Sequence, residues 1–218
     1  HGPQMTEVTL LHMLALYRQV RRLAKNQETH TWDRFLPYVL EDRLVAIMGL
    51  GAIAEHMARC FKALGMTVYG ISRTNRKIEG IDKVFSRDDL TEAVKDADFL
   101  IALVPFNLET HNIIGAKVFY AMKPSACLIN VARGGVVDEA ALIDALKNGE
   151  ISGAGLDVFE ESPLPDNSPL WDMENVFITP FTGGRSDKYA ERILTVIEPN
   201  IRAYLDGTKK YMKNIVQF

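Results

Sequence analysis

The stretch between residues 44 and 74 constrains the fold of this chain more than any other. It reads LVAIMGLGAIAEHMARCFKALGMTVYGISRT, in which an apolar run over Leu44–Met48 ends at a glycine turn. A helical pattern follows over Ala52–Leu64, and a second apolar run, Met66–Ile71, closes the unit. Strand, glycine turn, helix and strand in this order predict one right-handed crossover between two parallel strands.

The glycine turn has the sequence context of a phosphate-binding site. Gly49 allows the backbone to turn tightly after the strand, and Gly51 lacks a Cβ that would block a pyrophosphate. The amides of Ala52 and Ile53 then face the anion, because the N-terminus of a helix favours negative charge. Ala54, the third small residue, permits close packing of the helix on the strand. A turn without a ligand is the alternative, but the strand before it and the helix after it favour a dinucleotide.

The end of the second strand predicts which dinucleotide is bound. An acidic residue there would accept hydrogen bonds from the adenosine ribose and repel a 2′-phosphate. This chain instead has Ser72, Arg73 and Thr74, with Arg76 and Lys77 just beyond. A guanidinium and two hydroxyls suit a phosphate dianion, and two charge-assisted hydrogen bonds shift the preference about a hundredfold or more. We therefore expect NADP(H) rather than NAD(H), with a solvated basic turn as the alternative.

Beyond this unit, short apolar runs alternate with helical patterns. Continuous apolar runs such as Asp98–Val104 are typical of a parallel sheet that is covered on both faces. The alternation predicts an α/β fold with a doubly wound, Rossmann-like parallel sheet. Further strands are expected at residues 82–85, 98–104, 126–131, 151–159 and 176–179, and further helices at 88–96, 115–122 and 138–148.

Two helical segments flank this sheet. The N-terminal helix, Met5–Lys25, is apolar nearly all round, which predicts burial against a neighbouring domain or a second subunit. A polar linker follows it, and a last helix is expected over Ser186–Leu205. The expected divisions are a helix with its linker (residues 1–37), the dinucleotide-binding domain (residues 38–184) and a C-terminal return helix with its tail (residues 185–218).

The composition argues against several other classes of protein. The chain has 218 residues, of which 47% are hydrophobic and 24% charged, so it can bury a substantial core. A net charge of −3 is too close to neutral for nucleic acid or an acidic membrane to be the main partner. Two cysteines without metal-ligand spacing, no signal peptide and no run of about eighteen apolar residues predict a cytoplasmic protein without a metal site. The chain begins with His1, so we expect it to be processed, cut or incomplete.

A long motif begins at Ile129 and reads INVARGGVVDEAALIDALKNGEISGAGLDVFEESPLP. Together with the glycine turn, it closely resembles the D-isomer-specific 2-hydroxyacid dehydrogenases. That family includes phosphoglycerate dehydrogenase, glyoxylate and hydroxypyruvate reductases, and formate dehydrogenase. The opening HGPQMTE resembles the run into the family's interdomain helix, and Ser72, Arg73 and Thr74 resemble its NADP(H)-preferring reductases. The match covers nearly the whole chain.

The resemblance implies an architecture and a set of partners. Members of the family build half of a substrate domain, cross to the nucleotide domain and return by a C-terminal helix. The first half of the substrate domain is missing from this sequence. The resemblance implies that the flanking helices lie near the interdomain hinge and the dimer contact, so we expect a homodimer formed through them. It also implies a small 2-oxo or 2-hydroxy acid as the second ligand.

The resemblance further implies three residues for the chemistry. An arginine grips the substrate carboxylate, a histidine transfers the proton, and a glutamate orients the histidine. Arg133 stands at the arginine position, but Phe181 stands at the histidine position and Ser162 at the glutamate position. Phenylalanine cannot transfer a proton, and the loss of general acid–base catalysis costs roughly a hundred- to ten-thousandfold in rate.

Other positions are assigned to the cofactor by the same resemblance. Asp157 resembles the aspartate that hydrogen-bonds the nicotinamide carboxamide; a strand-end acid that satisfies a turn is the alternative. Residues 104–105 and 131–132 are implied to line the riboses, with core packing as the alternative. The candidate cofactor-binding residues are Gly49, Gly51, Ala52, Ile53, Ser72, Arg73, Thr74, Arg76, Val104, Pro105, Val131, Ala132, Arg133, Asp157, Phe181 and Gly183.

Three functions are compatible with these residues. The first, which we favour, is an NADP(H)-binding protein with little or no dehydrogenase turnover. The second is a working NADPH-dependent 2-ketoacid reductase of the glyoxylate or hydroxypyruvate type, whose N-terminal half is cut off or supplied separately. In that case water or His111 would donate the proton. The third is a dimerising scaffold with a vestigial cofactor site.

Overall fold

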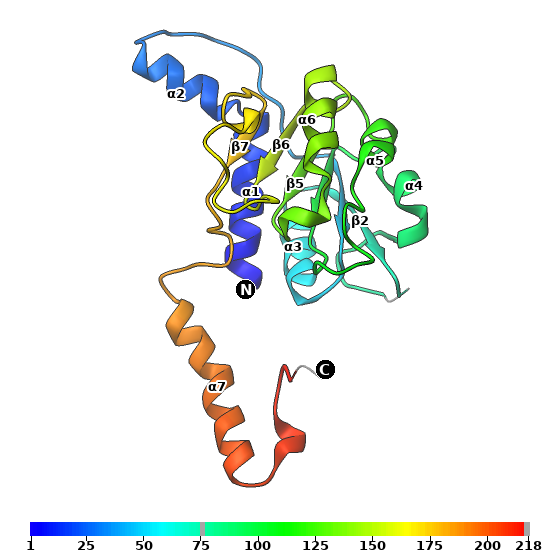
Figure 1. The fold of residues 1–218 in the computed structure, drawn as a ribbon, viewed down its shortest axis with the longest axis vertical. Helices are drawn as coiled ribbons and strands as arrows, with labels where there is room; N and C mark the ends of the chain where they lie inside the picture. Colours follow the sequence, from blue (N-terminus) through cyan, green and yellow to red (C-terminus); the bar gives the residue numbers. More distant parts are fainter. Residues whose placement is uncertain (75–76, 216–218) are drawn as a thin grey trace. The chain divides into compact units, whose positions relative to one another are not determined.

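The computed structural model describes residues 1–74 and 77–215 of the chain, drawn as a ribbon in Figure 1. Its contacts divide the chain into two units, His1–Gly183 and Gly184–Phe218, which are described here one at a time. The first unit contains the sheet and the candidate site residues. Arg76, predicted to bind the cofactor, lies outside the described residues.

The first unit is built on one parallel sheet, as the alternating pattern predicts. Among the described residues the sheet has seven strands, all parallel, in the order β3-β2-β1-β4-β5-β6-β7. This doubly wound topology confirms the predicted fold class. The strands are β1 (Leu44–Met48), β2 (Thr67–Ser72), β3 (Lys83–Ser86), β4 (Phe99–Ala102), β5 (Cys127–Asn130), β6 (Gly153–Leu156) and β7 (Val176–Ile178). β4 and β5 are shorter than their apolar runs because Val104 and Val131 leave the sheet but remain buried.

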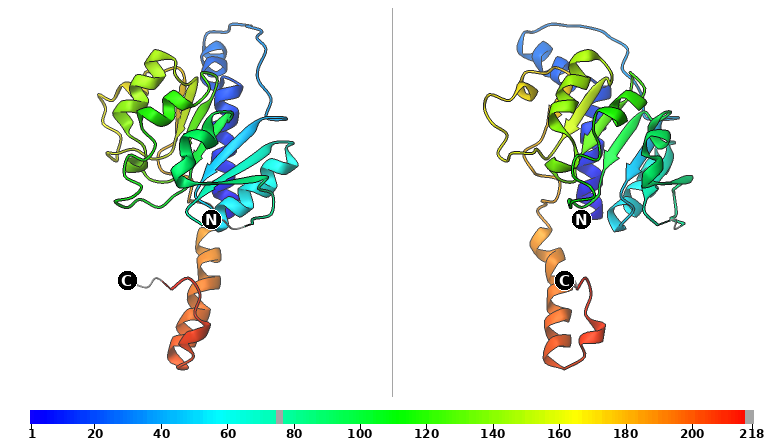
Figure 2. Two further views of the ribbon diagram at one scale, coloured as in Figure 1. Left: turned by 90° about the vertical axis from the view of Figure 1, so that its right-hand side faces the viewer. Right: turned by 45° about the vertical axis from the view of Figure 1, so that its right-hand side comes forward.

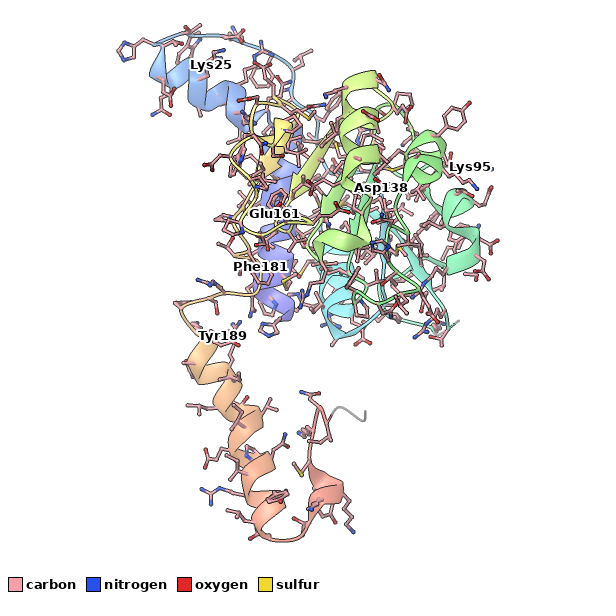
Figure 3. All side chains as sticks on the ribbon, in the orientation of Figure 1. Lys25, Lys95, Asp138, Glu161, Phe181 and Tyr189 are labelled. Carbon is pink, nitrogen blue, oxygen red and sulfur yellow. The ribbon has the colours of Figure 1, made fainter. Side chains whose placement is uncertain are left out.

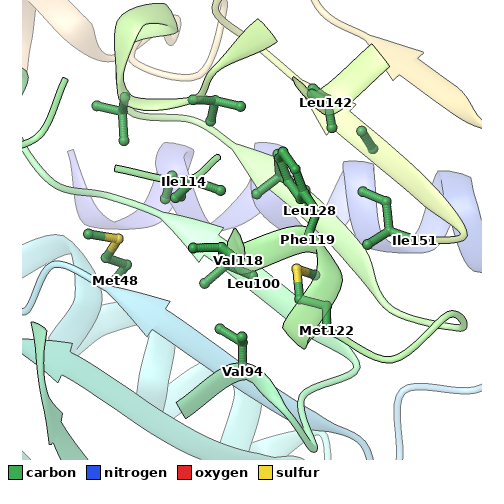
Figure 4. Close-up of a cluster of buried hydrophobic side chains, with 14 of the residues drawn as sticks. Met48, Val94, Leu100, Ile114, Val118, Phe119, Met122, Leu128, Leu142 and Ile151 are labelled. Atoms are coloured by element: carbon green, nitrogen blue, oxygen red, sulfur yellow. The ribbon is translucent and has the colours of Figure 1, made fainter. Parts of the chain in front are cut away.

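Helices cover both faces of the sheet (Figures 1 and 2). They are α1 (Gly2–Tyr17), α2 (Val20–Glu28), α3 (Ala52–Ala63), α4 (Leu90–Val94), α5 (Ala116–Ala121) and α6 (Glu139–Asn148), with 3₁₀ turns η1 (Arg87–Asp89), η2 (Gly134–Val136) and η3 (Pro169–Trp171). Side chains of α1 and α3 form one apolar core with the sheet, and those of α4, α5 and α6 form a second core. Side chains are drawn in Figure 3, and Figure 4 shows the second core, where Leu100 and Phe119 are fully buried. Burial of both faces explains why the central strands are apolar without alternation.

The N-terminal helical region differs from the single helix predicted over Met5–Lys25. α1 begins at Gly2, and Pro3 stands in its first turn, where a missing N–H removes no helical hydrogen bond. Gln19 has φ = 52°, a left-handed conformation that separates α1 from α2. α2 extends into the predicted linker and has no buried residue.

The apolar character of α1 is explained largely by the sheet of its own unit. α1 packs against α3, β5, β6 and β7. Met13 is fully buried, and the ring of Tyr17 lies 4.5 Å from that of Phe99. Leu11 and Leu14 remain exposed. A neighbouring domain or a second subunit could therefore contact α1 only on this side.

Local sequence sets the ends of the helices that follow. Asp138, the first residue of the helix predicted at 138–148, caps α6, because its Oδ1 accepts a hydrogen bond of 2.9 Å from the backbone N–H of Ala141. Gly149 ends α6 with φ = 70°, one residue after the predicted end of this helix. Asp89, one of the two acids expected at the start of the next helix, is the N-cap residue of α4, but its side chain makes no capping hydrogen bond. The preceding 3₁₀ turn η1 is capped by Ser86, whose Oγ accepts a hydrogen bond of 3.3 Å from the N–H of Asp88.

The second unit contains α7 (Tyr189–Leu205) and a 3₁₀ turn, η4 (Lys209–Tyr211). α7 begins later than the predicted start at Ser186. The side chain of Asn200 donates to the carbonyl of Lys213 and accepts from its N–H, both at 2.8 Å, which holds the tail. α7 has no buried residue, and its apolar side chains, such as Ile201, are exposed. In the part of the chain that the structure describes, no helix is long and apolar enough to cross a membrane.

Candidate functional site

The candidate site residues lie on one edge of the sheet. The strand order reverses between β1 and β4, and ligands of open α/β sheets bind at such a point, outside the carboxyl ends of the strands. The glycine turn follows β1, Val104 follows β4, Arg133 follows β5 and Asp157 follows β6. The fold therefore brings to one edge groups that are far apart in the sequence.

The glycine turn after β1 leaves space in front of a helix N-terminus. Gly49 has φ = 108°, and a Cβ built on it would lie 2.8 Å from the backbone that follows β4, so a side chain does not fit. Gly51 precedes α3, and a Cβ built there meets nothing within 4 Å. The first N–H groups of a helix, here those of Ala52 and Ile53, have no partner within it. Open space and free donors fit a pyrophosphate.

The end of β2 carries the residues predicted to select the dinucleotide. The N–H of Thr74 donates to Oγ of Ser72 over 3.3 Å, which orders the turn. Nη1 of Arg73 lies 3.0 Å from Oε2 of Glu109, and these side chains are 64% and 62% exposed. Sequence reasoning does not find Glu109, because it belongs to the loop after a different strand. A carboxylate therefore stands beside the guanidinium that is predicted to bind a phosphate.

The loops after β4 and β5 bring small apolar residues to the same edge. Val104 and Val131 are buried in opposite cores of the sheet, and Ala132 is buried as well. Pro105 is exposed. The core-packing alternative therefore accounts for the valines, while Pro105 is free to face a ligand.

Asn130, at the end of β5, shapes the turn that presents Arg133. Its Oδ1 accepts a hydrogen bond of 3.1 Å from the N–H of Ala132, and its Nδ2 donates over 3.2 Å to the carbonyl of Arg133. The Asn130 side chain is almost fully buried. Sequence reasoning missed this role, although a polar residue at the end of an apolar strand was a usable signal.

Arg133 is the residue of the implied catalytic trio that this chain retains. Its side chain is exposed, and Nη1 donates over 2.7 Å to the carbonyl of Ala132. Its Cζ lies 5.9 Å from the centroid of the Phe181 ring, within the range of a cation–π contact. A Cβ built on the next residue, Gly134, would lie 1.8 Å from the carbonyl oxygen of Phe159. The backbone at Phe159 thus leaves room only for a glycine next to Arg133.

Phe181 occupies the histidine position in a left-handed conformation. It lies on the segment after β7 and is labelled in Figure 3. Its φ is 54°, which costs a residue with a side chain about 1–2 kcal/mol. The N–H of Phe181 donates to the carbonyl of Asp157 over 3.0 Å, and its ring is 54% exposed. The structure therefore presents an aromatic ring, with no ionisable atom, where the resemblance implies an imidazole.

Asp157 holds the turn that carries Phe181. Its carboxylate is almost fully buried and accepts hydrogen bonds on both oxygens. Oδ1 accepts from the hydroxyl of Thr179 at 2.6 Å and from the N–H of Thr182 at 2.9 Å, and Oδ2 accepts from the N–H of Gly183 at 2.9 Å. These contacts match the alternative considered for Asp157, a strand-end acid that satisfies a turn. The turn is therefore rigidly placed.

His12 connects α1 to this turn. Its ring is buried, and Nε2 lies 2.9 Å from Oγ1 of Thr179. Burial lowers the pKa of His12 from 6.5 to about 4, although the nearby Asp157 carboxylate opposes the shift, so the ring is neutral at pH 7. A Cβ built on Gly155 of β6 would lie 2.5 Å from Cβ of His12, so the helix rests directly on the strand. Sequence reasoning places His12 in the flanking helix but does not find its partner.

The remaining candidates for an acid or a base have exposed side chains. Ser162, at the glutamate position, is exposed, as are Glu160 and Glu161. His111 is exposed too, and its ring meets Phe106 edge-on with centroids 5.8 Å apart. Within residues 1–74 and 77–215, no group of three His, Cys, Asp or Glu side chains is placed to hold a metal ion. The positions that the resemblance assigns to a histidine and a glutamate therefore both lack an ionisable group.

An open parallel sheet with a glycine turn before its first crossover helix, at the point where the strand order reverses, defines a dinucleotide-binding α/β domain. Comparison with known families gives a closer assignment. The model of the D-isomer specific 2-hydroxyacid dehydrogenase, NAD binding domain, matches residues 10–183. The chain therefore belongs to the D-isomer specific 2-hydroxyacid dehydrogenase family, as the motif from Ile129 predicts.

Individual relatives agree with this assignment. A glyoxylate reductase from Thermococcus litoralis is 40% identical over 174 residues, which is 79% of this chain and 52% of the reductase. A D-isomer specific 2-hydroxyacid dehydrogenase family protein from Aeromonas salmonicida has a crystal structure that matches with a TM-score of 0.91 at 33% identity, covering 99% of this chain and 68% of that one. An NADPH-dependent glyoxylate/hydroxypyruvate reductase from Sinorhizobium meliloti, solved with NADP and sulfate, matches with a TM-score of 0.88 at 31% identity and the same coverage. The chain spans about half the length of the curated relatives it matches.

Proposed function

We propose that this chain binds NADP(H) in preference to NAD(H) and has little or no turnover as a 2-hydroxyacid dehydrogenase. The observation that carries the proposal is Phe181, an aromatic ring at the histidine position on a turn held by Asp157. A phenyl ring neither donates nor accepts a proton at any pH. Ser162 replaces the orienting glutamate as well, so the two changes agree with each other.

The preference for NADP(H) rests on the residues after β2. Arg73 and the hydroxyls of Ser72 and Thr74 offer charge-assisted and neutral hydrogen bonds to a 2′-phosphate, and Arg76 is expected to add a second charge. The sequence from Ser72 to Lys77 contains no acid to accept from an unphosphorylated ribose. The S. meliloti relative, solved with NADP, supports the same choice.

Other residues have separate tasks in this proposal. The amides of Ala52 and Ile53 bind the pyrophosphate in the space beside Gly51, and Arg133 binds the carboxylate of a small 2-oxo or 2-hydroxy acid. A bound nicotinamide ring accepts or donates a hydride in this family's chemistry. Phe181 offers a flat apolar surface to that ring and excludes water from it.

Titration of the full chain with NADPH and NADH, followed by fluorescence, tests the binding. We expect micromolar affinity for NADPH and about a hundredfold weaker binding of NADH. Assays with glyoxylate and hydroxypyruvate then test turnover, and we expect neither acid to be consumed. Equal affinity for the two cofactors would contradict the preference, and brisk consumption of either acid would contradict the lack of turnover.

A working 2-ketoacid reductase is the second candidate. Retention of Arg133 favours it, as does the chain's span of about half its relatives' length, because a second polypeptide could supply the rest of a substrate domain. Water or the exposed His111 would then donate the proton. Robust NADPH oxidation by the full-length gene product, with glyoxylate or hydroxypyruvate present, would decide for this candidate.

We also propose a cytoplasmic homodimer formed through the flanking helices. Exposed Leu11 and Leu14 on α1 and the apolar side chains of α7 support the contact, and unpaired Cys60 and Cys127 support a reducing compartment. Light scattering after size-exclusion chromatography should give twice the mass of the chain, and a monomer at micromolar concentration would contradict the dimer. A dimer that binds neither cofactor would instead indicate a scaffold with a vestigial site.

A further inference from the structure

The phosphate-binding end of the candidate site contains a second arginine and a carboxylate that the proposed function leaves unused. We propose that Glu109 is an internal competitor for a 2′-phosphate: its carboxylate occupies the pair Arg73–Arg87 until a phosphate-bearing nucleotide displaces it. This inference rests on the proposed function, and it adds Arg87 to the phosphate subsite and Glu109 as the residue that weakens binding there.

The strand register places the two arginines side by side. β2 and β3 pair in parallel, and their last residues, Ser72 and Ser86, are partners in the register. The residues that follow, Arg73 and Arg87, therefore leave the same edge of the sheet from neighbouring strands. Sequence reasoning finds Arg73 alone, because Arg87 follows the short strand β3 and only the register brings it to the site.

Both guanidinium groups meet the same oxygen atom. Oε2 of Glu109 lies 3.0 Å from Nη1 of Arg73 and 3.5 Å from Nη1 of Arg87. Two positive charges and one negative charge leave these three side chains with a net charge of +1. A phosphate monoester carries close to two negative charges at pH 7 and offers three acceptor oxygens, so it neutralises the arginine pair more fully than one carboxylate does.

Arg87 is the less hydrated of the two arginines. Its side chain is 17% exposed, against 64% for Arg73. An ion pair weakens as solvent access rises, so an anion gains more from a partly buried guanidinium than from an exposed one. Arg87 is therefore expected to contribute to the affinity for a phosphate at least as much as Arg73 does.

The backbone of Glu109 is held in place while its side chain is free to turn. Oδ1 of Asn107 accepts hydrogen bonds from the N–H groups of Glu109 at 2.9 Å and Thr110 at 3.1 Å. The hydroxyl of Thr110, which is fully buried, donates over 2.7 Å to the carbonyl of Pro105. The loop thus always presents Glu109 to the arginines. Displacement by a phosphate requires only that the 62% exposed side chain rotates into solvent.

The competition has a limited strength. A solvent-exposed ion pair changes an equilibrium constant by no more than about fivefold. Removal of the Glu109 charge is therefore expected to tighten binding of a 2′-phosphate by about three- to fivefold, without a similar gain for a ligand that lacks this group.

Isothermal titration calorimetry of the full chain with adenosine 2′,5′-bisphosphate and with adenosine 5′-monophosphate tests the inference. The measured quantity is the ratio of the two dissociation constants, 5′-monophosphate over 2′,5′-bisphosphate. In Glu109→Gln we expect this ratio to rise about three- to fivefold. In Arg87→Gln, shown to be folded by circular dichroism, we expect it to fall about tenfold. An unchanged or smaller ratio in Glu109→Gln would overturn the inference, as would an unchanged ratio in Arg87→Gln.

Glu92→Gln is the matched control. Glu92 lies on α4, is 60% exposed and pairs with Lys95, so the variant removes the same charge from a similar exposed pair outside the site. We expect it to leave the ratio unchanged. An equal rise in Glu92→Gln and Glu109→Gln would show a general effect of net charge and overturn the inference.

The test separates this inference from the proposed function. Binding of both probes with a ratio that Glu109→Gln does not raise overturns the inference alone. If neither the unmodified chain nor Glu109→Gln binds either probe, the proposed function fails and the inference fails with it.

Discussion

The loops after β1 and β2 and the loops after β5, β6 and β7 share one sheet edge, but they depend on the sequence in different ways. In the first region, the proposed phosphate recognition depends on backbone N–H groups and on the open space beside Gly51. In the second region, proton transfer depends on the identity of single side chains. Phe181 and Ser162 stand where the resemblance to the family implies a histidine and a glutamate.

If the proposed loss of turnover is correct, the comparison teaches that the turn that carried a catalytic residue can keep its hydrogen bonds after that residue is replaced. The turn around Phe181 is still held by Asp157, and Asp157 is still linked through Thr179 to His12. Binding through backbone N–H groups tolerates most side-chain substitutions, whereas replacement of a single catalytic histidine removes general acid–base catalysis. The two regions therefore make separate demands on the chain, and variants in each should have separate effects.

The largest effect is expected from Gly134→Ala in the second region. The added methyl group would lie 1.8 Å from the carbonyl oxygen of Phe159 and 2.4 Å from the N atom of Glu160, so the loop must move. We expect the free energy of unfolding, measured in urea, to fall by about 3 kcal/mol or more. Gly51→Ala is the control, because its methyl meets nothing within 4 Å, and its stability should change by no more than about 1 kcal/mol, the cost of alanine at the N-cap of α3. A Gly134→Ala chain as stable as the control would show that this region is not rigidly packed.

A pH effect of similar size is expected from His12, the buried support of the second region. Below pH 6.5 the unfolded chain protonates this imidazole, whereas the folded chain keeps it neutral until about pH 4. The free energy of unfolding therefore falls as the pH drops from 6.5 to about 4, by up to roughly 3 kcal/mol. His12→Gln should lose less stability than the unmodified chain between pH 7 and pH 4.5 in urea titrations. His30→Asn, at an exposed histidine, should match the unmodified chain, and equal losses in all three chains would refute the role of burial.

A smaller effect, confined to binding, is expected from Gly51→Ala in the first region. Its methyl group occupies the space that a pyrophosphate needs, so NADPH should bind about tenfold or more weakly while the chain stays folded. Calorimetric titration with NADPH measures the change. Gly184→Ala, whose methyl also meets nothing within 4 Å, is the control. Unchanged affinity in Gly51→Ala would mean that the phosphates do not approach this turn.

The smallest effect is expected from Phe181→Ala. Loss of one aromatic face beside the nicotinamide should weaken NADPH binding about threefold, since such contacts contribute roughly 0.5–1.5 kcal/mol. Tyr120→Ala, at an exposed aromatic residue of α5, should leave the affinity unchanged. A loss as large as that of Gly51→Ala would break the separation between the two regions, because it would make binding depend on the second region as strongly as on the first.

The parts of the fold that follow from local pattern could be predicted from the sequence. The strand Leu44–Met48 was predicted to the residue, because a charged loop before the apolar run and a glycine turn after it mark both of its ends. The ends of α6 follow from Asp138 and Gly149 in the same way, since caps are set by neighbouring residues. The edge of the sheet that gathers the candidate site follows from the doubly wound order alone.

The parts that depend on distant partners could not be predicted. Glu109 beside Arg73 joins the loops of two strands, and the bond from His12 to Thr179 joins the first helix to the end of the same unit. The break at Gln19 was missed because nothing in its neighbours demands a left-handed residue there. Composition and periodicity carry no record of such contacts, which only the folded chain creates.

The contact between His12 and Gly155 has a consequence for related sequences. A side chain on residue 155 would enter the space of the His12 ring, so the two positions constrain each other across the helix–sheet contact. Relatives with a larger residue at position 155 should carry a smaller one at position 12, and they should lose the imidazole link to Thr179 in the same step. Covariation of positions 12 and 155 in an alignment of homologues would therefore be a sign that close packing of α1 on the sheet is maintained in evolution.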